Sequence, residues 1–159
     1  MISRGRLYVA ALAVAAWLGA ALITVAVVTP AAFAVLPSGT LSGALVGRVL
    51  PPLFIGAIVV SAIVLAAAGV PRMSGPGGQA SIAAVVVAAA SAIAQFVITP
   101  KLDAIRATIG GPVDALMPGD PRRVAFGLLH GYNVGGLGLA MIGGLACLVL
   151  LSLAIRPRS

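Results

Sequence analysis

The chain has 159 residues, of which 61% are apolar and only 8% charged, and its formal net charge is +7. Soluble domains carry about 25% charged residues, so this composition excludes an ordinary soluble protein. Four segments lack Asp, Glu, Lys and Arg, and each is long enough for the roughly 20 apolar residues of a membrane span. The sequence predicts one all-α domain over residues 1–159, an antiparallel bundle of four transmembrane helices. The expected spans are about 7–29, 49–70, 79–99 and 124–155.

The first predicted helix runs from about Leu7 to Thr29. It should end there because the residue before a proline, here Pro30, disfavours helical backbone. A basic start and the Ala32-Phe33-Ala34 pattern, which resembles a cleavage site with small residues at its ends, are also typical of a signal peptide. The apolar stretch is longer than the 7–15 residues of a typical signal core, so we interpret it as a retained helix.

The second predicted helix begins near Ser38, whose hydroxyl can cap the first turn, and continues to about Gly69. The pair Pro51-Pro52 removes two backbone donors and is the expected kink. A loop rich in Gly and Pro follows at 71–78. The third helix is expected from about Gln79 to Thr99.

After Pro100 the pattern changes. Leu102, Ile105 and Ile109 recur at helical spacing, while charged residues occupy the other positions. This pattern predicts a short amphipathic stretch at the membrane interface. Glycines at 110–111 should end it, and Asp120-Pro121 then predicts a capped start for the fourth helix, which runs to about Ile155.

Basic residues flank the apolar segments, where they can meet lipid headgroups rather than nucleic acid. With four spans, five basic residues fall on each side of the membrane, so the positive-inside rule gives a tie. Arg4 and Arg6 precede the first helix and favour cytoplasmic termini. We expect an integral protein of a bacterial inner (plasma) membrane with both termini in the cytoplasm.

The only histidine, His130, lies within an apolar segment, and an ionisable side chain there is a functional-site hypothesis by default. Alternating helix direction should bring several other polar residues to the same membrane face. The predicted pocket comprises His130, Asn133, Tyr132, Arg48, Gln95 and Thr99. Three of these have a simpler interpretation: His130 as a hydrogen-bonded packing residue, Arg48 as an arginine reaching up to headgroups, and Gln95 as a residue that hydrogen-bonds between helices.

Glycines repeat every fourth residue in the second and fourth predicted helices. The two series are Gly39, Gly43, Gly47 and Gly127, Gly131, Gly135. Small residues at this spacing form a glycine zipper through which membrane helices approach closely. We therefore expect the second and fourth helices to touch there.

Four fragments, in order, resemble the transmembrane protein 205-like family, a four-helix membrane domain of unknown function. They are Thr29–Phe33, Gly43–Pro51, Thr99–Arg106 and Phe126–Gly131. The chain departs from that family at Leu50, Asn133 and Leu137. It is also distantly similar to copper-resistance-D and protoporphyrinogen-oxidase membrane bundles, a resemblance that implies intramembrane histidines serving haem or a metal.

The sequence contains no catalytic constellation. It has one His, one Cys (Cys147) and three Asp, all three between residues 101 and 120, so we predict no catalytic residue, no metal site and no enzyme. Three functions remain open. The pocket binds or passes a small solute or lipid, in a monomer or a homo-oligomer; or the protein is a redox protein that binds haem or a metal; or it is a structural or assembly partner of a membrane complex.

Overall fold

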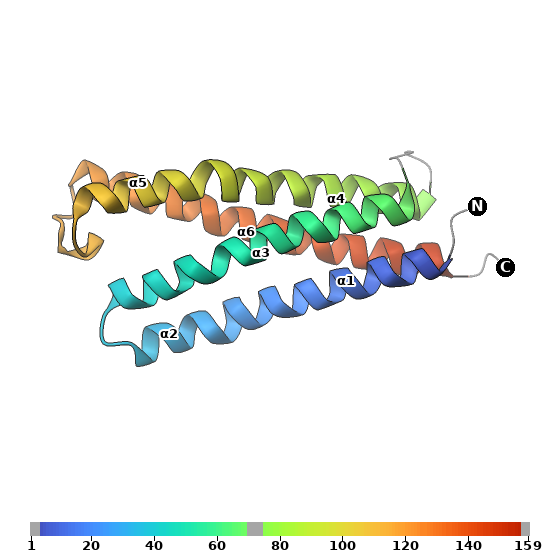
Figure 1. The fold of residues 1–159 in the computed structure, drawn as a ribbon, viewed down its shortest axis with the longest axis horizontal. Coiled ribbons are helices and arrows are strands. Elements are labelled where there is room, and N and C mark those ends of the chain that lie inside the picture. Colours follow the sequence, from blue (N-terminus) through green and yellow to red (C-terminus); the bar gives the residue numbers. More distant parts are fainter. Residues whose placement is uncertain (1–3, 70–74, 157–159) are drawn as a thin grey trace.

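The computed structural model describes residues 4–69 and 75–156, and every regular element there is helical. The elements are α1 (Arg4–Ile23), the π turn η1 (Thr24–Val28), α2 (Thr29–Val35), α3 (Gly39–Ala68), α4 (Gly75–Ile93), the π turn η2 (Ala94–Ile98), α5 (Thr99–Ile109), the 3₁₀ turn η3 (Val113–Ala115) and α6 (Pro121–Ile155). They form four long apolar rods, α1–α2, α3, α4–α5 and α6, packed side by side in an antiparallel bundle (Figure 1). The predicted fold class is confirmed.

Two helices continue through prolines at which we expected them to end. The first rod extends to Val35 and the third to Ile109, so the predicted ends before Pro30 and Pro100 are wrong. In each rod a π turn precedes the proline, and the threonine N–H bonds five residues back, Thr29 to Thr24 O and Thr99 to Ala94 O. The wider turn accommodates a residue that has no N–H and whose ring would clash in a regular α turn.

The predicted caps are confirmed. Ser38 Oγ accepts from Leu41 N at 3.3 Å, and Asp120 Oδ1 accepts from Arg122 N at 2.8 Å. Gly110 ends α5 with a φ of +66°, which glycine adopts readily.

Other boundaries differ in detail. α3 is continuous through Pro51 and Pro52. α4 begins at Gly75, four residues before the expected start, and residues 70–74 of the predicted loop lie outside the described residues. The amphipathic stretch is α5, a direct continuation of the third rod, with Leu102 buried and Lys101 exposed.

The core fills the half of the bundle in which α1 begins and α6 ends. Leu7, Val14, Val64 and Leu151 are buried at that end, and Trp17 lies at mid-length, where its Nε1 donates to Leu53 O at 2.9 Å. The last core cluster, Phe54, Ala94 and Leu137, marks the inner limit of tight packing. Beyond it lie the α2–α3 turn and the α5–α6 connection, together at the other end (Figure 1).

The glycine series do not pack as predicted. α3 contacts α1 and α4 but has no extensive contact with α6, which lies diagonally across the bundle. A Cβ on Gly43, Gly127, Gly131 or Gly135 would meet no described atom within 4 Å. Four other glycines are in close contact with neighbouring helices: Gly56, Gly136, Gly143 and Gly144. Four-residue spacing identified a helix face but not the helix opposite it.

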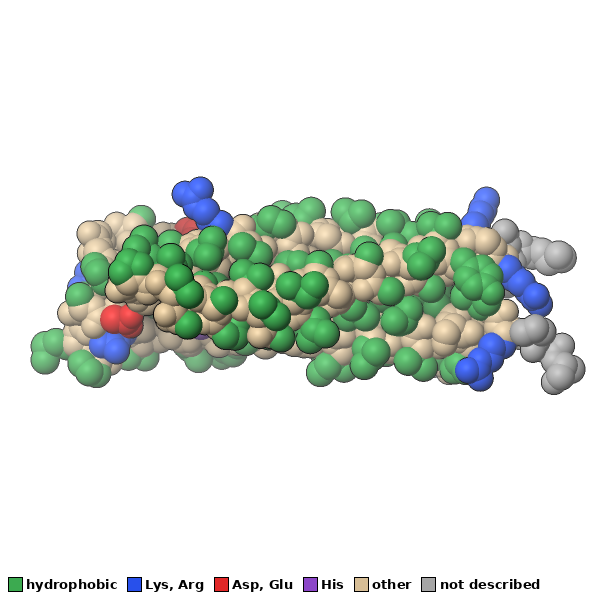
Figure 2. Space-filling model, turned by 90° about the horizontal axis from the view of Figure 1, so that it is seen from below, with side chains coloured by type: hydrophobic (Ala, Val, Ile, Leu, Met, Phe, Trp, Pro, Cys, Tyr) green, Lys and Arg blue, Asp and Glu red, His purple; other side chains and the backbone are tan. Residues whose placement is uncertain are grey.

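The outer surface suits a bilayer. Hydrophobic side chains cover the middle of the molecule, and most Lys and Arg side chains lie toward its two ends (Figure 2). Exposed Leu, Val and Ile residues occur along all four rods. The chain is an integral membrane protein whose helices contact lipid.

Close packing at Gly143 should be sensitive to a single methyl group. A Cβ there would lie 2.6 Å from Val87 Cγ2, and a helical valine has little rotamer freedom. We expect Gly143→Ala to cost about 1–3 kcal/mol through overpacking, partly offset by about 1 kcal/mol of helix propensity. The melting temperature in detergent should fall. Gly138→Ala is the control, because its Cβ meets nothing within 4 Å, and it should leave the melting temperature unchanged or raise it.

Candidate functional site

A cavity of about 770 Å³ lies between the rods at the loosely packed end. We call it the interhelical cavity. Its polar lining comprises Thr29, Thr40, Arg48, Thr99, Asp103, Arg106, Asp114, Arg123, His130 and Asn133. Its apolar lining includes Val25, Leu50, Val134 and Leu137. Leu137 also belongs to the innermost core cluster, so the packed half of the bundle forms the floor of the cavity.

Four of the six predicted pocket residues line this cavity: His130, Asn133, Arg48 and Thr99. Tyr132 does not, and its side chain is 58% exposed on another side of α6. Gln95 does not either. It lies in the π turn η2, and its buried Oε1 has no hydrogen-bond partner among the described residues, so this oxygen does not form the expected interhelical hydrogen bond.

Asn133 is the most constrained polar group of the site. Its side chain is only 4% exposed, and its Oδ1 has no hydrogen-bond partner within the described parts of the chain. A buried acceptor left unpaired costs about 1–3 kcal/mol. Asn133 therefore lines the cavity with a side chain whose buried amide oxygen is unsatisfied.

An aromatic and cationic column occupies one wall. Phe126 and His130 are one turn apart on α6, and their rings stack with centroids 6.2 Å apart and an interplanar angle of 4°. The Arg106 guanidinium of α5 lies 5.1 Å from the Phe126 centroid, within the range of cation–π attraction. A Cβ on Gly47 of α3 would lie 3.4 Å from Arg106 Nη1. The Arg106 side chain thus reaches from α5 to α3.

Three arginines from three helices line the cavity, and two have protein partners. Arg106 pairs with Asp103 at 3.1 Å. Arg123 Nη1 donates to Leu116 O at 2.7 Å. For the guanidinium of Arg48, no ion pair or hydrogen bond is found with residues 4–69 or 75–156.

Outside the cavity, an ion pair strengthens the start of α6. Arg122 Nη2 contacts Asp120 Oδ2 at 2.8 Å. Hydrogen bonds from the Arg122 side chain and backbone hold the pKa of Asp120 at about 2. The N-cap carboxylate therefore stays ionised until the pH falls far below the normal range of aspartate.

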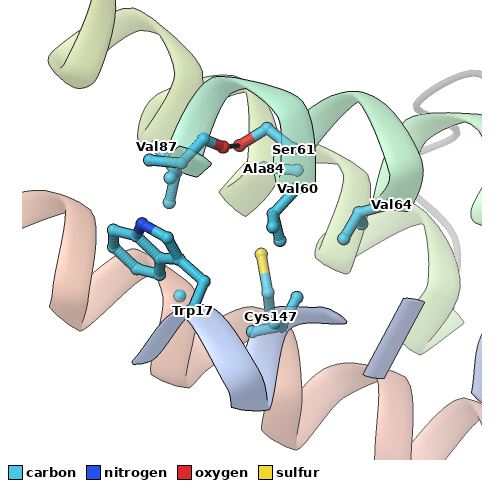
Figure 3. Close-up of a pocket in the computed structure, with 10 residues that line it drawn as sticks. Trp17, Val60, Ser61, Val64, Ala84, Val87 and Cys147 are labelled. Atoms are coloured by element: carbon cyan, nitrogen blue, oxygen red, sulfur yellow. Dashed lines mark hydrogen bonds between the residues drawn. The ribbon is translucent and has the colours of Figure 1, made fainter. Parts of the chain in front are cut away.

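A second gap, at mid-bundle, is too small to be a site. It holds about 10 Å³ and is lined by Trp17, Val60, Val64, Cys147 and their neighbours (Figure 3). That volume is at most one water molecule. The buried Cys147 thiol lies here, 3.4 Å from Ala80 O.

Metal chemistry finds little support in the described ranges. They contain no group of three or more His, Cys, Asp or Glu residues that could hold an ion. His130 is the one imidazole and stacks on Phe126. A haem would therefore depend on one strong ligand from each chain.

Sequence reasoning missed Asp103, Arg106, Asp114 and Arg123, because their place in the cavity depends on the path of the α5–α6 connection. One signal was present. Each of the four fragments that carry the transmembrane protein 205-like resemblance contributes residues to the cavity lining, as do the three positions of departure, Leu50, Asn133 and Leu137. Those fragments were more informative as a set than any of their residues alone.

Comparison with known proteins identifies one family. A family model described as "Domain of unknown function (DUF4149)" matches residues 12–110, more than half of the chain. The matched region includes three of the four fragments and ends before α6. No curated protein and no solved structure matches the chain. The resemblances to the transmembrane protein 205-like and copper-resistance-D bundles find no support in these comparisons and stay hypotheses.

Water access to the cavity can be measured with cysteines on α6. Val134 lines the cavity, whereas Leu139 is comparably exposed on the outside of the bundle. Thiols react as thiolates, which form where water reaches them. In a Cys147→Ala background in lipid nanodiscs, we expect a membrane-impermeant maleimide to label Val134→Cys several-fold faster than Leu139→Cys. Equal rates would mean that the cavity is closed to water.

Proposed function

The chain belongs to the DUF4149 family, a family of unknown function, and we propose that it is a membrane-embedded binding protein. Its interhelical cavity binds or passes a small solute or lipid. The unpartnered Asn133 oxygen in the wall of a 770 Å³ cavity carries the proposal. Buried polar atoms are normally hydrogen-bonded, and ligand pockets typically measure about 300–1,000 Å³.

The distribution of packing supports the same function. Tight clusters hold the rods together in one half, while the half with the polar residues encloses empty volume. Such an arrangement leaves room for a ligand without loss of the core. His130, on the column with Phe126 and Arg106, offers a flat surface and hydrogen-bonding nitrogens beside that volume.

We place the protein in a bacterial inner membrane with both termini cytoplasmic. Arg4 begins α1 at the end of the bundle where α6 ends. With that orientation the cavity lies in the half of the bilayer away from the cytoplasm. It would take up its ligand from the outer leaflet or the periplasm.

Filling the cavity should abolish ligand binding while the fold is retained. Gly127 lines the cavity and Gly135 does not, and a Cβ at either position meets nothing within 4 Å. We expect native mass spectrometry of mildly purified wild-type protein to detect a bound small molecule or lipid. Gly127→Leu should lose it and Gly135→Leu should keep it. Both substitutions gain similar helix propensity, so a difference between them reports on the cavity.

Retention of the same molecule by Gly127→Leu, with unchanged occupancy, would contradict binding in the interhelical cavity. An empty wild-type protein under every mild condition would contradict the function itself.

A haem- or metal-binding redox protein is the second candidate, favoured by the exposed edge of the cavity-lining His130. A single histidine supplies one strong axial ligand, so this function needs a weak second ligand or a homodimer. An absorption spectrum with metal analysis separates it from the first: we expect colourless protein. A Soret band that disappears in His130→Ala would replace our proposal with this one.

A structural role in a homo-oligomer or a larger membrane complex is the third candidate. Gly131 and Gly135 are exposed on α6 with open space at their Cβ positions, and small residues are typical of helix contacts within membranes. In this case Gly135→Leu, the control above, would disrupt the assembly, and size-exclusion chromatography would show it.

A further inference from the structure

We infer that the occupant of the interhelical cavity is an anionic amphiphile, with an acidic headgroup at Arg48 and a hydrocarbon part against the apolar lining. This inference rests on the proposed function and adds to it the chemical class of the ligand. Three features carry it: an unpaired charge at depth, a buried polar group without a partner, and a division of the cavity into polar and apolar zones.

Arg48 supplies the charge. It lies nine residues into α3, about 13 Å along the helix axis from Gly39, and His130 lies equally deep in α6, nine residues after Pro121. α3 is about 45 Å long, so several ångströms of its start can lie outside a hydrocarbon core of about 30 Å. Arg48 is an exposed residue, and with the excess length shared equally between the two ends of α3 its backbone lies about 6 Å inside the hydrocarbon boundary. A guanidinium at such depth is costly unless an anion or polar group compensates it.

The protein itself does not provide that anion. Asp103 is engaged by Arg106 at 3.1 Å, and the Arg106 guanidinium lies against Gly47, next to Arg48. Asp114 lies beside the start of α3, where its Oδ2 is 3.5 Å from the Cβ position of Gly39. Gly39 is nine residues away from Arg48. The Arg and Asp side chains of the lining are three arginines and two aspartates, which leaves one excess positive charge among them, and Arg48 is the arginine without a partner among the described residues.

Asn133 adds a neutral polar contact one turn deeper than His130. Its amide carries an acceptor and two donors, and the oxygen is unpaired. The ionised oxygens of a carboxylate or phosphodiester headgroup can accept from the amide N–H groups, and only a hydroxyl on the headgroup can donate to the unpaired oxygen. A simple inorganic anion would satisfy Arg48 and leave the deeper zone empty.

That deeper zone is hydrocarbon in character. Val25, Leu50, Val134 and Leu137 line it, and Leu137 closes it against the core. Burying a methylene chain there is favourable by the hydrophobic effect. An acidic head and an apolar body together describe a long-chain carboxylate or an acidic phospholipid, and these two share the chemistry that the cavity recognises.

The test compares the binding of a charged probe with that of its uncharged analogue. A fluorescent long-chain fatty acid and its methyl ester are titrated onto the purified protein in neutral detergent at about pH 8, where a free carboxyl is ionised. Hydrogen bonds to a charged group support a difference of about tenfold to a hundredfold in affinity. We expect the acid to bind at least tenfold more tightly than the ester.

Variants locate the charge. Arg48→Gln should weaken binding of the acid about tenfold or more and leave the ester unchanged, and Arg48→Lys should retain part of the preference. Lys101→Gln is the control, because Lys101 is an exposed cation of α5 that does not line the cavity. Loss of the preference in Lys101→Gln as well as in Arg48→Gln would overturn the assignment to Arg48.

Two further arms identify the source of the headgroup. If an acidic phospholipid is the natural occupant, phosphatidylglycerol displaces the fluorescent acid and phosphatidylcholine does not. Displacement of the fluorescent acid by inorganic phosphate alone would overturn the role of the hydrocarbon part. Equal affinity for acid and ester, abolished in both cases by Gly127→Leu, would refute the anionic class and leave the proposed binding function standing. Binding of both probes that is unaffected by Gly127→Leu would refute both.

Discussion

The close approach of small residues in one half of the bundle is the constraint on which the rest of the structure depends. Membrane helices gain no hydrophobic driving force from one another, so their association relies on van der Waals contact and hydrogen bonds. Gly143 against Val87, Gly144 against Trp17 and the buried alanines supply that contact. Because these interactions are concentrated toward one membrane face, the opposite half can remain loosely packed and still belong to a stable bundle.

The difference in packing between the two halves of the bundle explains where the polar residues lie. A buried arginine or asparagine within the tight half would displace core side chains and lack partners. In the loose half the same groups border open volume, which water or a ligand can fill. The stacked rings of Phe126 and His130 belong to the same helix, α6, as Leu137 of the last core cluster, so the tightly packed half anchors the helix that carries this wall of the cavity.

Much of the fold was predictable because it follows from local chemistry. Apolar length gave the four helices, and Ser38, Gly110 and Asp120 marked boundaries through caps that depend on a few neighbouring atoms. The wrong predictions, the helix ends before Pro30 and Pro100 and the contact between the two glycine series, came from rules that hold only under certain conditions. A proline is expected to end an α-helix only if the preceding turn is an α turn, and glycine spacing shows a face without naming its partner.

The site was predictable to a smaller extent. Alternating helix direction predicted that Arg48, Thr99, His130 and Asn133 share one membrane face, and all four line the cavity. It could not distinguish Asn133 from Tyr132, because that requires the rotation of α6 against its neighbours. It also could not find Arg106 or Arg123, whose positions depend on a connection of irregular backbone between α5 and α6.

The two π turns have a geometric consequence for the parallel rods that contain them. Such a turn holds one more residue than an α turn, and each residue of an α-helix advances the chain by about 100° around its axis. The side chains of α2 and α5 are therefore rotated around the helix axis relative to those of α1 and α4. Core packing determines which faces of α1 and α4 point inward, and after this rotation Thr29 and Thr99 line the cavity. Each turn is immediately followed by Thr-Pro, and a proline cannot donate to a regular α turn. The phase shift is consequently fixed at one level of the membrane, where the core ends and the cavity begins.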